Sequence, residues 1–165
     1  MRFLRLIRHL ATTRWSTRWR FTPQVRAAIE QAIGRCEAQH AGEIRFVVET
    51  ALDLPELWHD LPPRLRALQL FGQLGVWDTA HNNGVLIYVL MADRVVEIIA
   101  DRGIAERIAQ PEWQAVCRQM EQHYRARRYG EGSIAGIEGV AALLGRHFPG
   151  RHHSDHELPN QPVLL

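Results

Sequence analysis

Two long apolar runs that are separated by only a few residues limit the fold of this chain more than any other feature. They cover about residues 83–91 and 94–101. Because the connection is so short, the two runs must pair as an antiparallel hairpin. Apolar residues occupy both alternating faces of the first run: Val85, Ile87, Val89 and Met91 on one, and Leu86, Tyr88 and Leu90 on the other. Such strands are typical of a sheet that helices cover on both sides.

The segment before the hairpin predicts a helix, a strand and a second helix. Thr22 and Pro23 are typical of a helix start, and we expect this helix to close at Gly42. Residues 43–50 read as a strand, and Pro62-Pro63 opens a second helix that ends near Gly75. Strand, helix and strand in this order indicate a crossover unit. The expected class is therefore α/β, with helices packed on a mixed sheet.

Three further helices are expected after the hairpin, at about residues 104–109, 112–129 and 133–147. Gly136 and Gly139 predict close packing of the last one. We divide the chain into an N-terminal segment 1–21, an α/β domain 22–148, and an irregular tail 149–165 whose apolar end folds back.

The N-terminal segment predicts a basic amphipathic helix. Its apolar side holds Phe3, Leu6, Ile7 and Leu10, and its basic side holds Arg2, Arg5, Arg8 and His9. Two interpretations remain open. The helix docks on its own domain, or it attaches the protein to anionic lipid or to a partner through residues 1–20.

Composition excludes several classes of protein. The 20 basic and 18 acidic residues give a net charge of +2, too small for a general attraction to nucleic acid, and basic and aromatic residues are not interleaved as a stacking surface requires. Cys36 and Cys117 have neither zinc nor disulfide spacing. The longest apolar run falls well short of the roughly 20 residues that span a bilayer. Arg5 and Arg8 interrupt any export signal, so we expect a cytoplasmic protein.

Polar residues gather at one end of the predicted hairpin. A turn at Ala92-Asp93 places Gly84 opposite Asp101 and Asn83 opposite Arg102. The resulting rim contains Asp78, Thr79, Asn82, Asn83, Asp101, Arg102 and Gly103. Its carboxylate, amide and hydroxyl oxygens suit Ca²⁺ or Mg²⁺, and Arg102 with Gly103 suits a phosphate. The alternative is purely local: Asp101 caps the next helix, and Asp78 with Thr79 forms a turn.

Glu97 is unusual because it is a carboxylate in the middle of an apolar strand. In the same register it lies opposite Tyr88. It either bonds to Tyr88 or supports the rim site from behind. The tail carries His147, His152, His153 and His156 with Asp155, but their spacing matches no zinc site.

Four stretches together resemble the TPM domain family, in particular its short soluble bacterial members. They are "LGVWDTAHNNGVLIYVLMADRVVEIIADRGI", "EWQAVCRQM", "GIEGVAALLGRHFP" and "ELPNQPVLL". The resemblance implies a Rossmann-like αβα sandwich, an association with divalent cations such as Ca²⁺, a link to acid phosphatase activity, and a link to membrane proteins of the LemA family.

The family's Asp-Thr before the strand matches Asp78 and Thr79, its Asn-Gly matches Asn83 and Gly84, and its D-R-G-I begins at Asp101. The tail departs from the family's N-E-L-P-D, since His156 and Asn160 replace its first and last residues. No nucleophile elbow or P-loop is present. We therefore favour a non-catalytic or weakly catalytic module that binds a cation and docks on a membrane-associated partner, with a metal-assisted phosphatase as the alternative.

Overall fold

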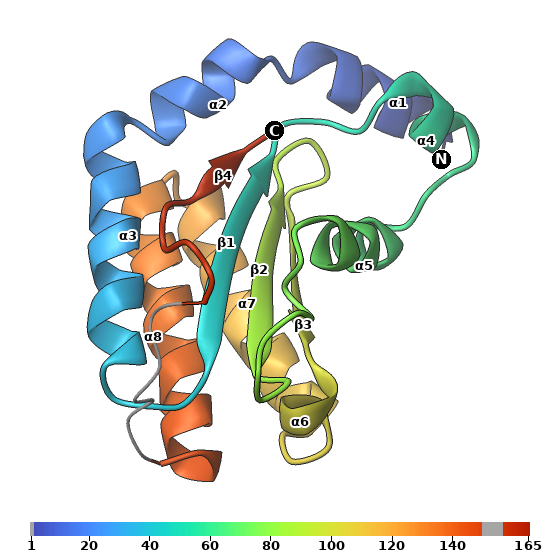
Figure 1. The fold of residues 1–165 in the computed structure, drawn as a ribbon. Coiled ribbons are helices and arrows are strands. Elements are labelled where there is room, and N and C mark those ends of the chain that lie inside the picture. Colours follow the sequence, from blue (N-terminus) through green and yellow to red (C-terminus); the bar gives the residue numbers. More distant parts are fainter. Residues whose placement is uncertain (1, 150–156) are drawn as a thin grey trace.

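A four-stranded mixed sheet forms the middle layer of the molecule (Figure 1). The computed structural model describes residues 2–149 and 157–165. The strands are β1 (Glu43–Glu49), β2 (Gly84–Leu90), β3 (Val95–Ala100) and β4 (Val163–Leu164), in the spatial order β3-β2-β1-β4. β1 runs parallel to both β2 and β4, and β3 is antiparallel to β2.

Helices cover both faces of the sheet, as the apolar strands predict. α3 (Pro23–Glu37), α7 (Gln110–Arg125) and α8 (Tyr129–His147) pack on one face, where Phe46, Val85 and Ile87 are buried. α5 (Pro63–Gln73) packs on the other face against Leu86, Tyr88 and Leu90. α4 (Leu54–Trp58) and α6 (Arg102–Ala105) are short connecting helices. The expected αβα sandwich is confirmed.

The predicted hairpin register is also confirmed. Val85 lies opposite Ala100, and Tyr88 lies opposite Glu97. β2 is buried along its whole length because it has a strand on each side and helices on both faces.

The helix bounds differ from the prediction in instructive places. Thr22 caps α3 as expected, and its hydroxyl accepts the N–H of Val25 at 3.3 Å. The helix ends at Glu37, however, and not at Gly42. Gly42 has a packing role instead, since a Cβ there would lie 2.6 Å from Cδ1 of Leu144 on α8.

Close approach of α7 and α8 depends on small residues, as predicted. A Cβ on Gly136 would lie 2.2 Å from the sulfur of Met120, and one on Gly139 would lie 3.1 Å from Val116. The tail folds back as expected and supplies a strand that the sequence did not reveal. Val163 and Leu164 of β4 pair with Val47 and Val48 of β1.

The N-terminal segment forms two helices rather than one. α1 (Arg2–Ala11) and α2 (Arg14–Arg20) run across the end of the sheet at which β1 and β2 finish (Figure 1). The break falls at Thr12 and Thr13 because the Thr13 hydroxyl caps α2, accepting the N–H of Ser16 at 3.2 Å. Within residues 2–149 and 157–165, none of the helices has both the length and the apolar character to cross a bilayer.

Candidate functional site

The polar rim predicted from the hairpin forms at the end of the sheet where β2 begins. The N–H of Asp101 donates to the carbonyl of Gly84 at 2.9 Å. Gly103 lies so close to the preceding loop that a Cβ there would be 2.7 Å from the carbonyl oxygen of Asn82. Residues 78–83 and 101–103 are therefore neighbours in space, although about 20 residues of hairpin separate them in the chain.

Asp101 occupies the centre of this rim and is buried. It caps α6, with Oδ1 accepting the N–H of Arg102 at 2.6 Å. Its other oxygen, Oδ2, is buried and has no hydrogen-bond partner within the described part of the chain. A buried carboxylate oxygen without a partner is costly, so this atom is the strongest sign of a ligand at the rim.

The other rim residues fall into two groups. Thr79 and Asn83 are buried and hold the loop: the Thr79 hydroxyl accepts the N–H of Asn83 at 3.1 Å, and the Asn83 amide donates to the carbonyl of Ala41. Asp78, Asn82 and Arg102 are exposed. The cap of the local interpretation is thus present, and Thr79 holds the loop, whereas the side chain of Asp78 makes no hydrogen bond within the described residues. The cap uses only one of the two oxygens of Asp101.

Two buried glutamates next to the rim were not assigned a role from the sequence. Glu37 at the end of α3 accepts the N–H of Ile44 at 2.8 Å, and Glu43, opposite Gly84 in the sheet, accepts the N–H of Leu158 at 3.3 Å. Burial, together with the nearby charge of Glu43, raises the pKa of Glu37 to about 8. The one sequence signal that could have marked Glu43 as a buried carboxylate is its position at the start of an apolar strand.

The donor set of the rim fits a hard cation only in part. Carboxylate, amide and backbone oxygens are the ligands that Ca²⁺ and Mg²⁺ take. Among the residues that the structure describes, no group of three or more His, Cys, Asp or Glu side chains is placed to hold a metal. A cation here would therefore depend on at most two carboxylates, those of Asp101 and Asp78, together with neutral oxygens.

Glu97 and Tyr88 do not bond to each other, so the prediction of that bond is wrong. Tyr88 instead donates to Glu49 at 2.5 Å, and Glu49 also accepts from Arg66 of α5 at 2.6 Å. Glu97 lies 3.3 Å from Arg64 at the sheet edge. The Glu49–Arg66 and Glu97–Arg64 contacts both join the sheet to α5, and strand register alone could not reveal them.

Of the histidines near the tail, His147 is the last residue of α8, and residues 152–156 lie outside the described residues.

At the other end of the sheet, α1 is attached through its charged side. Asp93, in the turn between β2 and β3, lies 2.8 Å from Arg5 and 3.1 Å from Nε2 of His9. His9 is buried, and its Nδ1 accepts the N–H of Leu52 at 2.9 Å. Burial alone would raise the pKa of Asp93, but the bonds with His9 and Arg5 outweigh it and hold the pKa at about 2.

The apolar side of this segment consequently faces outward. The exposed fractions are 72% for Phe3 and 65% for Leu10 on α1, and 75% for Trp15 and 74% for Trp19 on α2. Trp58, the last residue of α4, is also exposed. Arg5 connects α1 to the segment just after α4, where its guanidinium lies 2.9 Å from Asp60. We call the exposed side chains of Phe3, Leu4, Leu10, Trp15 and Trp19 the outer apolar surface. These five large apolar side chains lie on two consecutive helices, and exposed apolar patches on soluble domains often mark a binding surface.

A mixed sheet with helices packed on both faces places the protein in the α/β class. Comparison with known proteins identifies its family. The model of the TPM domain matches residues 19–143. The chain belongs to the TPM domain family. A search of curated proteins gave no match.

Two solved structures are similar to this fold. The NMR structure of the BA42 protein from the psychrophilic bacterium Bizionia argentinensis is 28% identical, with a TM-score of 0.76 over 87% of this chain and 94% of that one. The N-terminal domain of a protein from P. gingivalis is 21% identical, with a TM-score of 0.64 over 81% of this chain and 82% of that one. The second likeness concerns the fold alone.

Proposed function

We propose that this TPM domain is a non-catalytic module that attaches peripherally to an anionic membrane surface, on the cytoplasmic side of the inner membrane, through α1 and α2. The observation that carries the proposal is the orientation of α1, whose charged side contacts the domain while its apolar side faces solvent. Its charged residues are used for attachment to Asp93, which leaves Phe3, Leu4 and Leu10 in solvent. A helix that served only the domain's own packing would bury these side chains.

The composition of this surface favours lipid over a protein partner. Trp15 and Trp19 are amphipathic rings of the kind that settle at the boundary between headgroups and acyl chains. Arg14 and Arg18 are exposed and each directly precedes one of these tryptophans in sequence, and no carboxylate is within 4.0 Å of either in the described residues. Each arginine near an anionic surface contributes about 1 kcal/mol. A membrane protein such as one of the LemA kind is the other occupant to be considered.

Vesicle flotation tests the proposal. The wild-type protein should float with phosphatidylglycerol vesicles and much less with phosphatidylcholine vesicles. Trp15→Ser/Trp19→Ser should reduce flotation about tenfold or more, because two interfacial rings are lost. Trp77→Ser removes an exposed tryptophan elsewhere and should leave flotation unchanged. If the wild type stays in solution with both vesicles, lipid attachment is rejected and a protein partner takes its place.

The second candidate function is binding of Ca²⁺ or Mg²⁺ at the rim, and the partnerless Oδ2 of Asp101 favours it. Asp101 and Asn83 would hold the ion together with loop oxygens from Asp78, Thr79 and Asn82, and Arg102 and Gly103 would receive a phosphate group. A bound cation would polarise a phosphoryl oxygen. Weak phosphomonoester hydrolysis is then the expected chemistry.

Titration with Ca²⁺ and with Mg²⁺, observed at the amides of residues 78–84 and 101–104, tests this site. Asp101→Asn should remove the response, yet keep the fold, since asparagine caps a helix as well as aspartate does. Asp53→Asn, which changes an exposed cap on α4, should respond like the wild type. Hydrolysis of p-nitrophenyl phosphate is measured for the same variants. If Asp101→Asn releases p-nitrophenol at the wild-type rate, phosphatase activity at this site is ruled out.

A further inference from the structure

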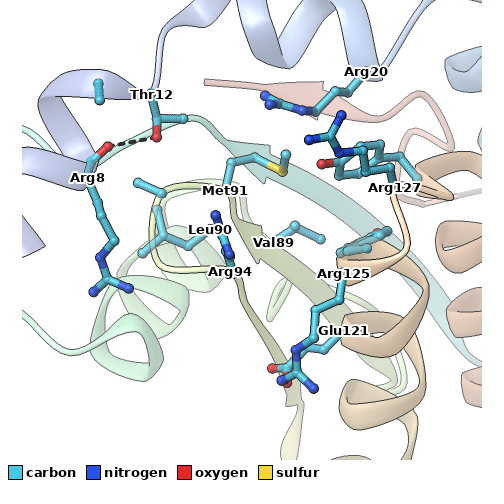
Figure 2. Close-up of a pocket in the computed structure, with 14 residues that line it drawn as sticks. Arg8, Thr12, Arg20, Val89, Leu90, Met91, Arg94, Glu121, Arg125 and Arg127 are labelled. Carbon is cyan, nitrogen blue, oxygen red and sulfur yellow. Dashed lines mark hydrogen bonds and ion pairs between the residues drawn. The ribbon is translucent and has the colours of Figure 1, made fainter.

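A cavity of about 410 Å³ lies between the α1–α2 segment and the end of α7. Figure 2 shows arginines from separate parts of the chain around it. They are Arg8 of α1, Arg20 of α2, Arg94 of the β2–β3 turn, Arg125 at the end of α7, and Arg127 between α7 and α8. We call this cavity the arginine pocket. It lies at the end of the sheet opposite to the rim, near the last residues of β2.

Carboxylates neutralise only part of this positive charge. Arg8 lies 3.4 Å from Asp93, which is outside the pocket lining. Among the described residues that line the pocket, Glu121 is the single acidic one, and it is already engaged by Arg125 at 3.3 Å and by the N–H of Val96 at 3.2 Å. Arg94 and Arg127 have no carboxylate within 4.0 Å in the described residues. Like charges held together repel each other, and an anion between them would remove that repulsion.

The backbone at two of these arginines is unfavourable for any residue except glycine or asparagine. Arg94 has φ 57° and Arg127 has φ 60°. Arg127 follows the last turn of α7, and the N–H of the next residue, Arg128, donates to the carbonyl of His123 at 3.0 Å. Glycine normally occupies this position of a helix end. A left-handed conformation costs roughly 1 kcal/mol for a residue with a Cβ, so local conformation does not explain either arginine.

The position of the pocket agrees with a general property of α/β sheets. Ligands bind beyond the carboxyl ends of the parallel strands, where loops and helix ends supply their contacts. β1 and β2 are the central parallel pair here, and Val89 to Ala92 at the end of β2 form one wall. The rim lies at the amino ends of the same strands. The two sites are therefore separate.

We propose that the arginine pocket binds a phosphate group, either of a soluble phosphate compound or of an anionic lipid headgroup. Guanidinium groups bind phosphate oxygens in pairs of hydrogen bonds, and Arg94 and Arg127 carry such a fork with no carboxylate partner among the described residues. The volume exceeds that of one phosphate, so pyrophosphate or a phosphate ester fits it better. The inference goes beyond membrane attachment and does not depend on it.

Isothermal titration calorimetry with pyrophosphate at low salt measures binding to the pocket and tests the proposal. Arg94→Gly/Arg127→Gly should weaken binding tenfold or more. The melting temperature should stay the same or rise, because glycine adopts positive φ without strain. The matched control Arg35→Ala/Arg118→Ala removes the same charge from exposed positions outside the pocket, and its affinity should stay within about twofold of the wild type.

A second arm distinguishes the two sources of phosphate. The same three proteins are floated with phosphatidylglycerol vesicles. Loss of pyrophosphate binding in the glycine variant supports a soluble ligand, and loss of flotation alone supports a headgroup. If the glycine variant and the control match the wild type in both arms, or if the wild type binds in neither, the proposal is overturned. If flotation depends on Trp15 and Trp19, and the glycine variant matches the wild type in both pyrophosphate binding and flotation, membrane attachment stands and the pocket is rejected.

Discussion

Glu37 illustrates how a single buried carboxyl group couples stability to pH. Its side chain accepts the N–H of Ile44 beside Glu43, and its pKa is raised from 4.5 to about 8. The folded state therefore holds the proton more tightly than the unfolded chain does. It follows that Glu37 lowers the free energy of unfolding as pH rises from about 4.5 to about 8, with little further change above that range.

Glu37→Gln should remove most of this dependence, since glutamine resembles the protonated acid. At pH 8 the variant should be more stable than the wild type by about 1–3 kcal/mol, and at pH 4.5 the two should be similar. Urea unfolding at several pH values measures the difference. Glu30→Gln, an exposed position on the same helix, serves as the control. Parallel pH profiles of Glu37→Gln and the wild type would contradict the assignment.

At the scale of elements, α1 depends on Asp93. The carboxylate binds Arg5 and His9, and its pKa is lowered to about 2. A lowered pKa means that this attachment is complete above the ordinary value of about 4 and is lost as pH falls from there toward 2.

Asp93→Asn should loosen α1 without affecting the sheet. Removing Asp93 from this mostly buried cluster leaves Arg5 with Asp60 as its carboxylate partner and His9 with none among the described residues, and we expect a loss of about 2 kcal/mol. Hydrogen exchange should accelerate in residues 2–20 and remain slow in β1 and β2. Asp78→Asn, at an exposed position, should show neither effect. Unchanged protection of α1 in Asp93→Asn would show that other contacts hold it.

At the scale of the whole molecule, β4 completes the sheet beside β1. The N–H of Leu165 donates to Val48 at 2.9 Å, and Val163 and Leu165 pack against the α5 face. Deletion of residues 163–165 would expose an edge of the central strand β1.

We expect this deletion to lower the free energy of unfolding by about 2–3 kcal/mol and to promote aggregation through the open edge. Chemical unfolding and light scattering measure the two effects. Gln161→Ala, which changes an exposed side chain just before β4, should behave like the wild type. A truncated chain of normal stability would mean that β4 contributes no packing.

Features that arise from local pattern could be predicted, and those that arise from distant charges could not. The hairpin register followed from a short turn and alternation, and the cap at Thr22 followed from its neighbours. The bonds of Glu49 to Tyr88 and Arg66 join three separate elements, so no sequence window contains them. The orientation of α1 stayed open for the same reason, because an amphipathic pattern does not say which side meets the domain, and the charge of Asp93 that decides it lies in a remote turn.

The outer apolar surface also bears on how the protein behaves in a test tube. Without a bilayer, the aromatic and aliphatic groups of one copy can meet those of another, so self-association should increase with protein concentration. A mild detergent below the level that unfolds the domain would cover these groups and keep the copies apart.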